Sequence, residues 1–160
     1  DLAQVADDAA GIVQVDRRRE ITYDRAAVVE KFGVQPGSIP DWLALVGDAA
    51  DGIPGVPRWG AKTAAQMLSR YGHLENIPDD WEQWEVRPRG AQAVAASLAE
   101  HREDAVLYKR LATLRLDVPL AETLEQLRWE GVPKLKYQAL CAELGFESLM
   151  DLPSRWTGEG

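Results

Sequence analysis

Residues 47–63 read GDAADGIPGVPRWGAKT and carry two signals. The first is a pair of aspartates, Asp48 and Asp51, three positions apart. The second is a glycine-rich segment that is followed at once by a lysine and a threonine. Because apolar, helix-forming residues stand on both sides of the segment, it is typical of a tight turn between two helices. The sequence therefore predicts a carboxylate pair next to a helical hairpin.

The two aspartates have a spacing that suits a divalent metal ion. On a helix or helical turn, Asp48 and Asp51 share one face, where their like charges repel unless a cation lies between them. A hard ion such as Mg2+ or Mn2+ fits, since it takes carboxylates, waters and substrate phosphate as ligands. The alternative is a solvated helix end at which Asp51 caps the next segment.

The hairpin has the features of a phosphate-binding turn. Gly55 and Gly60 bracket residues 56–59, and glycine permits a close backbone approach. The amides from Gly60 onward are expected to start a helix, where unpaired N–H groups and the helix dipole favour an anion. Lys62 adds a charged donor and Thr63 a hydroxyl, so the segment can grip DNA phosphates without reading sequence. The alternative is an ordinary corner between two helices.

Residues 47–64, GDAADGIPGVPRWGAKTA, resemble the pattern GDxxDNIPGVxGIGxKTA of the bacterial 5′→3′ exonuclease and flap endonuclease family. That family includes the nuclease domain of DNA polymerase I and free-standing relatives. Residues 1–5 resemble the end of its DKDLxQL segment, and residues 71–75 its (Y/W)GSLE. Residues 111–120 resemble its LATIxxDVPL, and residues 146–149 fall where the family has FxSLL. The resemblance covers nearly the whole chain in the same order.

The resemblance implies a fold class and a function. The fold is expected to be mainly α with a small β-ribbon, the C-terminal helix–hairpin–helix (helix–three-turn–helix) portion of an α/β PIN-like 5′ nuclease. The implied activity is a structure-specific 5′ nuclease of DNA replication and repair, a 5′→3′ exonuclease or flap endonuclease that hydrolyses DNA by divalent-metal catalysis. Its catalytic and metal residues would be Asp1, Asp48 and Asp51. Its contacts to double-stranded DNA with a 5′ end or flap, with K+ at the hairpin, would be Gly55, Val56, Arg58, Gly60, Lys62 and Thr63.

Between Gly55 and Gly60, two residues depart from the family pattern. Arg58 stands where the pattern has glycine, which can alter the turn and the K+ site, and it adds a cation beside the phosphate path. Trp59 stands where the pattern has Ile or Val. As an aromatic residue in an apolar position, Trp59 is interpreted as a buried anchor of the hairpin, with base stacking as the alternative.

Family members also carry an upstream α/β region with further metal-binding acids and a basic arch. This chain opens at Asp1, without a methionine, which is expected of an internal segment whose partner is the upstream part of the same nuclease. Two-metal hydrolysis needs ions about 3.5–4 Å apart. The three aspartates are expected to hold one of these sites only. The rival hypotheses are a non-catalytic helix–hairpin–helix module that binds duplex DNA, and a protein-docking domain.

Composition fits one compact domain, and the resemblance implies a cytoplasmic monomer acting at the bacterial nucleoid. The 160 residues suffice for a core, and no run approaches the roughly 20 apolar residues that span a membrane. No secretory leader is visible, and a lone Cys141, interpreted as a core thiol, fits a reducing compartment. The net charge of −8 opposes DNA binding, but residues 58–71 contain three cations and no acid.

Periodicity and capping signals predict the remaining elements. Two short strands around Arg17–Arg19, an exposed basic turn, are expected at residues 11–15 and 20–23. Lys109 and Arg110 are interpreted as solvent-facing, and the histidines as no metal pair. Helices are expected at 25–32, capped by Asp24 and ended by Gly33, and at 40–46, 64–71, 91–99, 103–111, 120–127 and 134–144. The expected segments are the end of the nuclease core with the ribbon (1–24), the hairpin region (25–75), a helical region (76–153) and a frayed tail (154–160).

Overall fold

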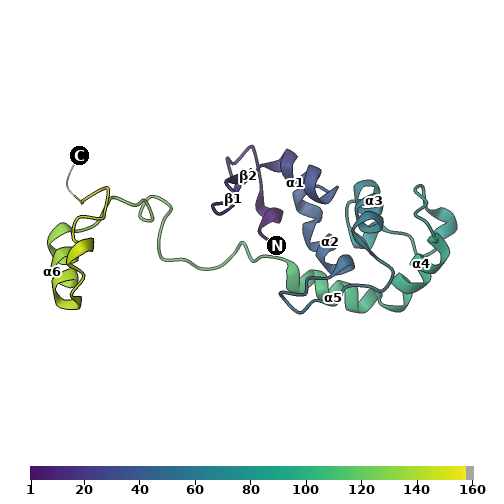
Figure 1. The fold of residues 1–160 in the computed structure, drawn as a ribbon. Coiled ribbons are helices and arrows are strands. Elements are labelled where there is room, and N and C mark those ends of the chain that lie inside the picture. The colour runs from purple at the N-terminus through teal and green to yellow at the C-terminus, as the bar shows by residue number, and fades with distance from the viewer. Residues whose placement is uncertain (158–160) are drawn as a thin grey trace. The chain divides into compact units, whose positions relative to one another are not determined.

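The computed structural model describes residues 1–157 as a mainly helical chain with one antiparallel two-stranded sheet (Figure 1). This confirms the predicted fold class. Contacts divide the chain into two compact units, one from Asp1 to Leu116 and one from Asp117 onward. Within residues 1–157, no helix combines the length and apolar character needed to cross a bilayer. The α-helices are α1 (Arg25–Phe32), α2 (Ile39–Val46), α3 (Ala61–Tyr71), α4 (Ala91–Glu100), α5 (Arg102–Ala112) and α6 (Lys134–Leu144).

The sheet is the expected β-ribbon around the basic turn. Strand β1 (Gln14–Asp16) pairs with β2 (Ile21–Tyr23), and Val15 lies opposite Thr22. The Asp16 carboxylate accepts hydrogen bonds from the amides of Arg18 and Arg19, at 3.1 and 3.0 Å, and so shapes the turn. Within the first unit, the ribbon lies at one end and α4 at the other (Figure 1).

Helix α1 has both ends that the sequence predicts. The Asp24 carboxylate accepts a hydrogen bond of 2.8 Å from the Ala27 amide, which satisfies a donor of the first turn. Gly33 ends the helix with a φ of 72°, a left-handed conformation that glycine adopts without a Cβ clash, and its amide bonds to the Val29 carbonyl.

The core of the first unit lies between α2, α3, α4 and α5. Helix α2 packs most extensively against α5 and also contacts α3. The short 3-10 helix η1 (Leu2–Val5) joins this core through Gln4, whose side chain bonds to the Ala112 carbonyl and the Leu114 amide, each at 3.0 Å. The largest fully buried apolar side chains are Ile39, Leu45, Met67, Leu68, Leu74, Leu98, Val28 and Val34.

A buried carboxylate joins these helices. Asp41, in the first turn of α2, has a relative exposure of 0%. One of its oxygens lies 2.7 Å from the Lys109 Nζ and accepts a hydrogen bond of 2.8 Å from the Leu74 amide. The other oxygen lies 3.0 Å from Nδ1 of His73. Lys109 also contacts Glu75 at 2.7 Å, so the sequence-based interpretation of Lys109 as a solvent-facing charge is wrong.

The same contacts shift two pKa values. Burial alone would lower the pKa of Lys109, but hydrogen bonds and charge interactions with Asp41 and Glu75 outweigh it and raise that pKa above its usual 10.5. Burial would likewise raise the pKa of Glu75, but the hydrogen bond from Lys109, a backbone hydrogen bond and the nearby charges of Lys109 and His73 together outweigh it, and the pKa falls below 4.5. Both shifts favour the charged forms. The ion pairs therefore stabilise the fold at pH values between 4.5 and 10.5, the usual pKa values of the two groups.

The second unit is built on α6, at the predicted bounds. Helix α6 ends at Gly145, and Cys141 within it is 3% exposed, as expected of a core thiol. The predicted frayed tail begins at Ser154, yet the Thr157 amide bonds to the Val132 carbonyl at 3.0 Å. Trp156 also packs edge-on against Tyr137, with ring centroids 5.8 Å apart. The rest of that predicted tail, residues 158–160, lies outside the described residues.

One predicted helix, at residues 120–127, is wrong. The segment forms a single hydrogen-bonded turn, in which the Thr123 amide donates to Oε1 of Gln126 at 2.7 Å. Leu120 and Leu124 are 71% and 87% exposed, so the apolar side chains that suggested a helix do not pack into a core. A short helix without a packed face is marginal in water, which explains why the turn does not propagate.

We predict that Asp41→Ala destabilises the first unit by about 3 kcal/mol, because it leaves the half-buried Lys109 and the Leu74 amide without their shared acceptor. Urea unfolding at neutral pH measures the change. The matched control is Glu75→Gln, which alters the exposed arm of the same network and should cost less than about 1 kcal/mol. Equal losses in the two variants would contradict the central place of Asp41.

Candidate nucleic-acid interface and carboxylate turn

The two aspartates of the opening motif lie on a hydrogen-bonded turn just after α2. The amides and carbonyls of Asp48 and Ile53 bond to each other twice, both at 2.8 Å, and close a loop over residues 49–52. One Asp48 carboxylate oxygen accepts a bond of 3.0 Å from the Ala50 amide, and Asp51 is exposed. Both carboxylates are thus on this loop, beyond the last helical residue, Val46.

Two glycines let the start and end of this loop meet. Gly47 and Gly55 have φ values of 91° and 76°. A Cβ on Gly55 would lie 2.6 Å from the Gly47 nitrogen, and a Cβ on Gly47 would lie 2.8 Å from the Ile53 carbonyl oxygen. No side chain fits at either position without moving backbone. Gly55 therefore closes the carboxylate turn, and it is itself buried.

After the crossing, the place where the backbones of Gly47 and Gly55 meet, the chain continues into the tight turn of the hairpin. The Val56 amide donates to the Leu45 carbonyl at 2.8 Å, and the Trp59 backbone amide donates to the Val56 carbonyl at 3.0 Å. Val56 is 4% exposed, so its side chain is part of the core that holds the hairpin. Arg58 is exposed and has a φ of 71°, a region that a glycine at this position would occupy without strain.

Trp59 is the buried anchor that the sequence predicts. It is 3% exposed, and its indole N–H donates to the Val94 carbonyl of α4 at 3.1 Å. Its ring also meets Trp84 edge-on, with centroids 6.4 Å apart. A side chain held in this way is not available for stacking on a base. Its contacts instead fix the hairpin against α4.

Helix α3 begins at Ala61, three residues before the sequence-predicted start. Gly60 precedes it in an extended conformation, and a Cβ there would meet no atom within 4 Å. No side chain among the described residues caps the first turn of α3. Lys62 is exposed and Thr63 half-buried at this end. Free amides, a lysine and open space are what a phosphate group needs at a helix N-terminus.

The three predicted metal-binding aspartates are not gathered into one cluster. Asp1 caps η1, where its carboxylate accepts a bond of 2.8 Å from the Leu2 amide. In residues 1–157, no group of three or more His, Cys, Asp or Glu side chains is placed to hold a metal ion. Asp48 lines a hollow of about 490 Å3 beside Gly52 and Ile53. Asp48 and Asp51 supply hard oxygen donors that fit part of a hydrated Mg2+ or Mn2+ site.

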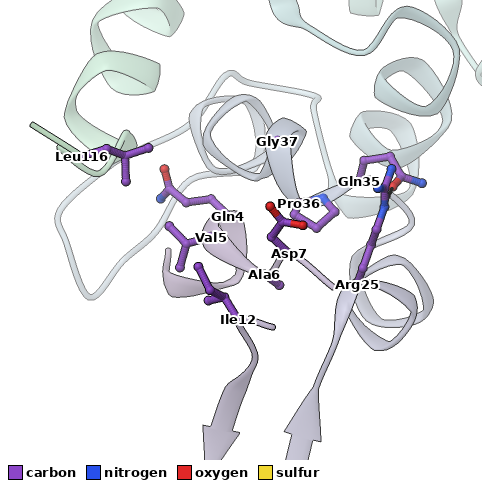
Figure 2. Close-up of a pocket in the computed structure, with 10 residues that line it drawn as sticks. All are labelled: Gln4, Val5, Ala6, Asp7, Ile12, Arg25, Gln35, Pro36, Gly37 and Leu116. Carbon is purple, nitrogen blue, oxygen red and sulfur yellow. Dashed lines mark hydrogen bonds between the residues drawn. The ribbon is translucent and has the colours of Figure 1, made fainter. Parts of the chain in front are cut away.

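A second hollow, of about 440 Å3, lies between η1, the loop at residues 7–12, the start of α1 and the short 3-10 helix η2 (Pro36–Ser38) (Figure 2). Arg25 and Gln35 bound it on one side, with the Arg25 Nε donating to Gln35 Oε1 at 2.8 Å. Figure 2 shows the Asp7 carboxylate next to Pro36, and Val5 and Ile12 on the side away from Arg25 and Gln35. None of the sequence-predicted site residues lines this hollow.

Comparison with known proteins bears directly on these features. Residues 34–134 match a family model described as the C-terminal SAM fold of 5′-3′ exonuclease. DNA polymerase I of Bacillus caldotenax is 38% identical over 129 residues, which are 81% of this chain and 14% of that protein. The 5′-3′ exonuclease of Buchnera aphidicola (Schizaphis graminum) is 34% identical over 128 residues, 79% of this chain and 44% of that protein. The 5′-3′ exonuclease of Aquifex aeolicus is 32% identical over 151 residues, 94% of this chain and 48% of that protein.

The hairpin and its helices are therefore those of a nuclease-associated, SAM-like helical fold. The chain belongs to the 5′-3′ exonuclease C-terminal SAM fold family, whose model covers more than half of it. The chain spans less than half the length of the relatives named above. The family match includes the carboxylate turn, the hairpin and α2 to α5, and this confirms the resemblance read from the sequence.

We predict that Arg58→Gly raises the free energy of unfolding by about 0.5–1 kcal/mol. A left-handed φ costs a non-glycine residue about 1–2 kcal/mol, and the greater freedom of glycine in the unfolded chain returns part of that gain. Urea unfolding measures the difference. Arg87→Gly, at an exposed position without a positive φ, is the control and should not stabilise. A loss of stability in Arg58→Gly would show that the side chain, rather than the backbone, determines this turn.

Proposed function

We propose that this chain is the DNA-gripping part of a metal-dependent 5′ nuclease. The reaction is hydrolysis of a phosphodiester near a 5′ end or flap, as 5′→3′ exonuclease or flap endonuclease. The observation that carries the proposal is the uncapped N-terminus of α3, with Lys62 beside it, directly after the buried hairpin. The match to the 5′-3′ exonuclease family agrees with it.

The hairpin supplies rigid, sequence-independent contacts to duplex DNA. The backbone of Gly55, Val56 and Gly60 is held by the loop closure and by Trp59, so little order has to be gained on binding. The amides at the start of α3, the Lys62 ammonium and the Thr63 hydroxyl donate to phosphate oxygens. Such contacts position a duplex and carry no sequence information. K+ at the hairpin carbonyls belongs to the same proposal.

Asp48 and Asp51 contribute ligands to a divalent-metal site, with Asp1 as a further acid. A bound Mg2+ or Mn2+ supplies Lewis-acid activation of water and stabilisation of the leaving oxygen. The turn closed by Asp48 and Ile53 fixes the carboxylate positions, and its exposure leaves room for phosphate. The remaining ligands come from the upstream part of the same nuclease, which is the proposed partner of this otherwise monomeric chain. The proposed setting is replication and repair in the bacterial cytoplasm.

A non-catalytic module that binds duplex DNA is the second candidate function. One observation favours it for this chain alone: within residues 1–157, no three acidic, histidine or cysteine side chains form a metal cluster. The two candidates share the hairpin and differ in what Asp48 and Asp51 do. Cleavage assays separate them, and binding assays test what they share.

We predict that Asp48→Ala with Asp51→Ala, in the full-length nuclease, slows cleavage of a 5′-flap substrate by about 100-fold or more at saturating Mg2+. Loss of metal ligands removes several kcal/mol of transition-state stabilisation. The matched control is Glu122→Ala with Glu125→Ala, which removes two exposed acids at the same spacing in the second unit. Single-turnover rates measure the effect. Unchanged turnover in the aspartate variant would refute the metal assignment.

We predict that Lys62→Ala weakens binding to all duplex sequences by a similar factor and lowers the slope of log Kd against log[KCl] by about 1. Fluorescence anisotropy of this chain with two duplexes of unrelated sequence measures both quantities. Lys136→Ala, an exposed lysine of α6, is the control and should leave the slope unchanged. A loss confined to one of the sequences would count against a phosphate contact.

A further inference from the structure

The segment that leads into α4 presents two arginines to solvent. Arg87 and Arg89 are exposed, whereas Pro88 between them is buried. Alternate exposure is expected of extended backbone, in which positions i and i+2 share a side. The Arg87 guanidinium lies over the Trp81 ring, 5.3 Å from its centroid, which holds this segment in place. Neither arginine is among the sequence-predicted site residues.

Helix α4 is fixed to the hairpin, so this segment has a defined position beside it. The Ser97 hydroxyl donates to the Pro57 carbonyl at 2.6 Å, and the Trp59 indole donates to the Val94 carbonyl at 3.1 Å. Arg58 lies between these two attachment points in the sequence. Gly90 precedes Val94 by one helical turn, about 6 Å along the axis. Arg89 therefore lies just before the first turn of α4, the helix whose Val94 contacts Trp59 of the hairpin.

The cations of the first unit differ in how they are paired. Arg70, Arg102 and Lys109 each form an ion pair with a carboxylate. Within the described part of the chain, no carboxylate lies within ion-pair distance of three exposed cations, namely Arg58, Lys62 and Arg89. Residues 52–74 and 86–99 also contain no Asp or Glu. The hairpin and the α4 segment thus combine two acid-free stretches in an acidic chain.

We propose that Arg89, on the segment before α4, is a second phosphate contact to the duplex that the hairpin holds. An unpaired guanidinium binds phosphate without first losing a carboxylate partner, and displacement of condensed counterions makes the contact favourable. The attachment of α4 to Pro57 and Trp59 sets its distance from the first contact. The proposal rests on duplex binding by the hairpin and extends it to phosphates beyond the α3 N-terminus.

The test is a salt titration of this chain with a 5′-flap duplex, monitored by anisotropy, for Arg89→Gln, Lys62→Ala and the double variant. Arg89→Gln should weaken binding three- to tenfold and lower the slope of log Kd against log[KCl] by about 0.9. Because the two cations contact different phosphates, their effects should add, giving a fall of about 1.8 in the double variant. Arg110→Gln, an exposed arginine of α5, controls for loss of one charge. Thermal unfolding checks that each variant is folded.

The outcomes separate this inference from the proposed function. A lowered slope for Lys62→Ala with an unchanged slope for Arg89→Gln would refute the second contact alone. Equal losses in Arg89→Gln and Arg110→Gln would also refute it, because they would reflect net charge rather than position. Unchanged slopes in both Arg89→Gln and Lys62→Ala, or no duplex binding by the native chain, would overturn the proposed function as well.

Discussion

Asp41 carries a fully buried carboxylate that is the shared partner of segments far apart in the chain. It lies in the first turn of α2 and binds Lys109 of α5, together with His73 and the Leu74 amide just after α3. A buried charge is tolerated only when it is paired and hydrogen-bonded. These segments therefore cannot separate without leaving the Asp41 carboxylate unpaired or exposing it to solvent. Helix α2 leads into the carboxylate turn and α3 follows the hairpin. The network therefore fixes both elements that flank the candidate site.

In the candidate site, backbone groups of the hairpin are the proposed phosphate contacts, and aspartate side chains are the proposed metal ligands. The crossing of Gly47 and Gly55 and the burial of Trp59 make the hairpin a rigid backbone structure, which suits phosphate contacts. Asp48 and Asp51 stand on the turn enclosed by that crossing, where their oxygens remain open to metal and water. In the proposed arrangement a strongly acidic chain can bind DNA, because Arg58, Lys62 and Arg89 lie in stretches that contain no Asp or Glu, so no neighbouring carboxylate opposes a phosphate there.

Local signals predicted much of this fold. Asp24 and Gly33 fix the ends of α1 through their own hydrogen bonds, so the sequence alone locates them, and the family pattern locates the hairpin. What the sequence could not show depends on tertiary contact. Asp41 and Lys109 are 68 positions apart and look like ordinary surface charges until the fold joins them. The segment at 120–127 has a helical pattern but no packing partner, and it does not form a helix.

In the proposed complex, the hairpin and the start of α3 contact duplex DNA through their backbone. Backbone amide NMR of this chain, titrated with a 5′-flap duplex, tests it most directly. We expect the largest shift changes at the amides of Gly60, Ala61, Lys62 and Thr63, smaller changes at Arg89, and none in α6. Shift changes centred on the β-ribbon or on α6, with the α3 N-terminus unchanged, would contradict it.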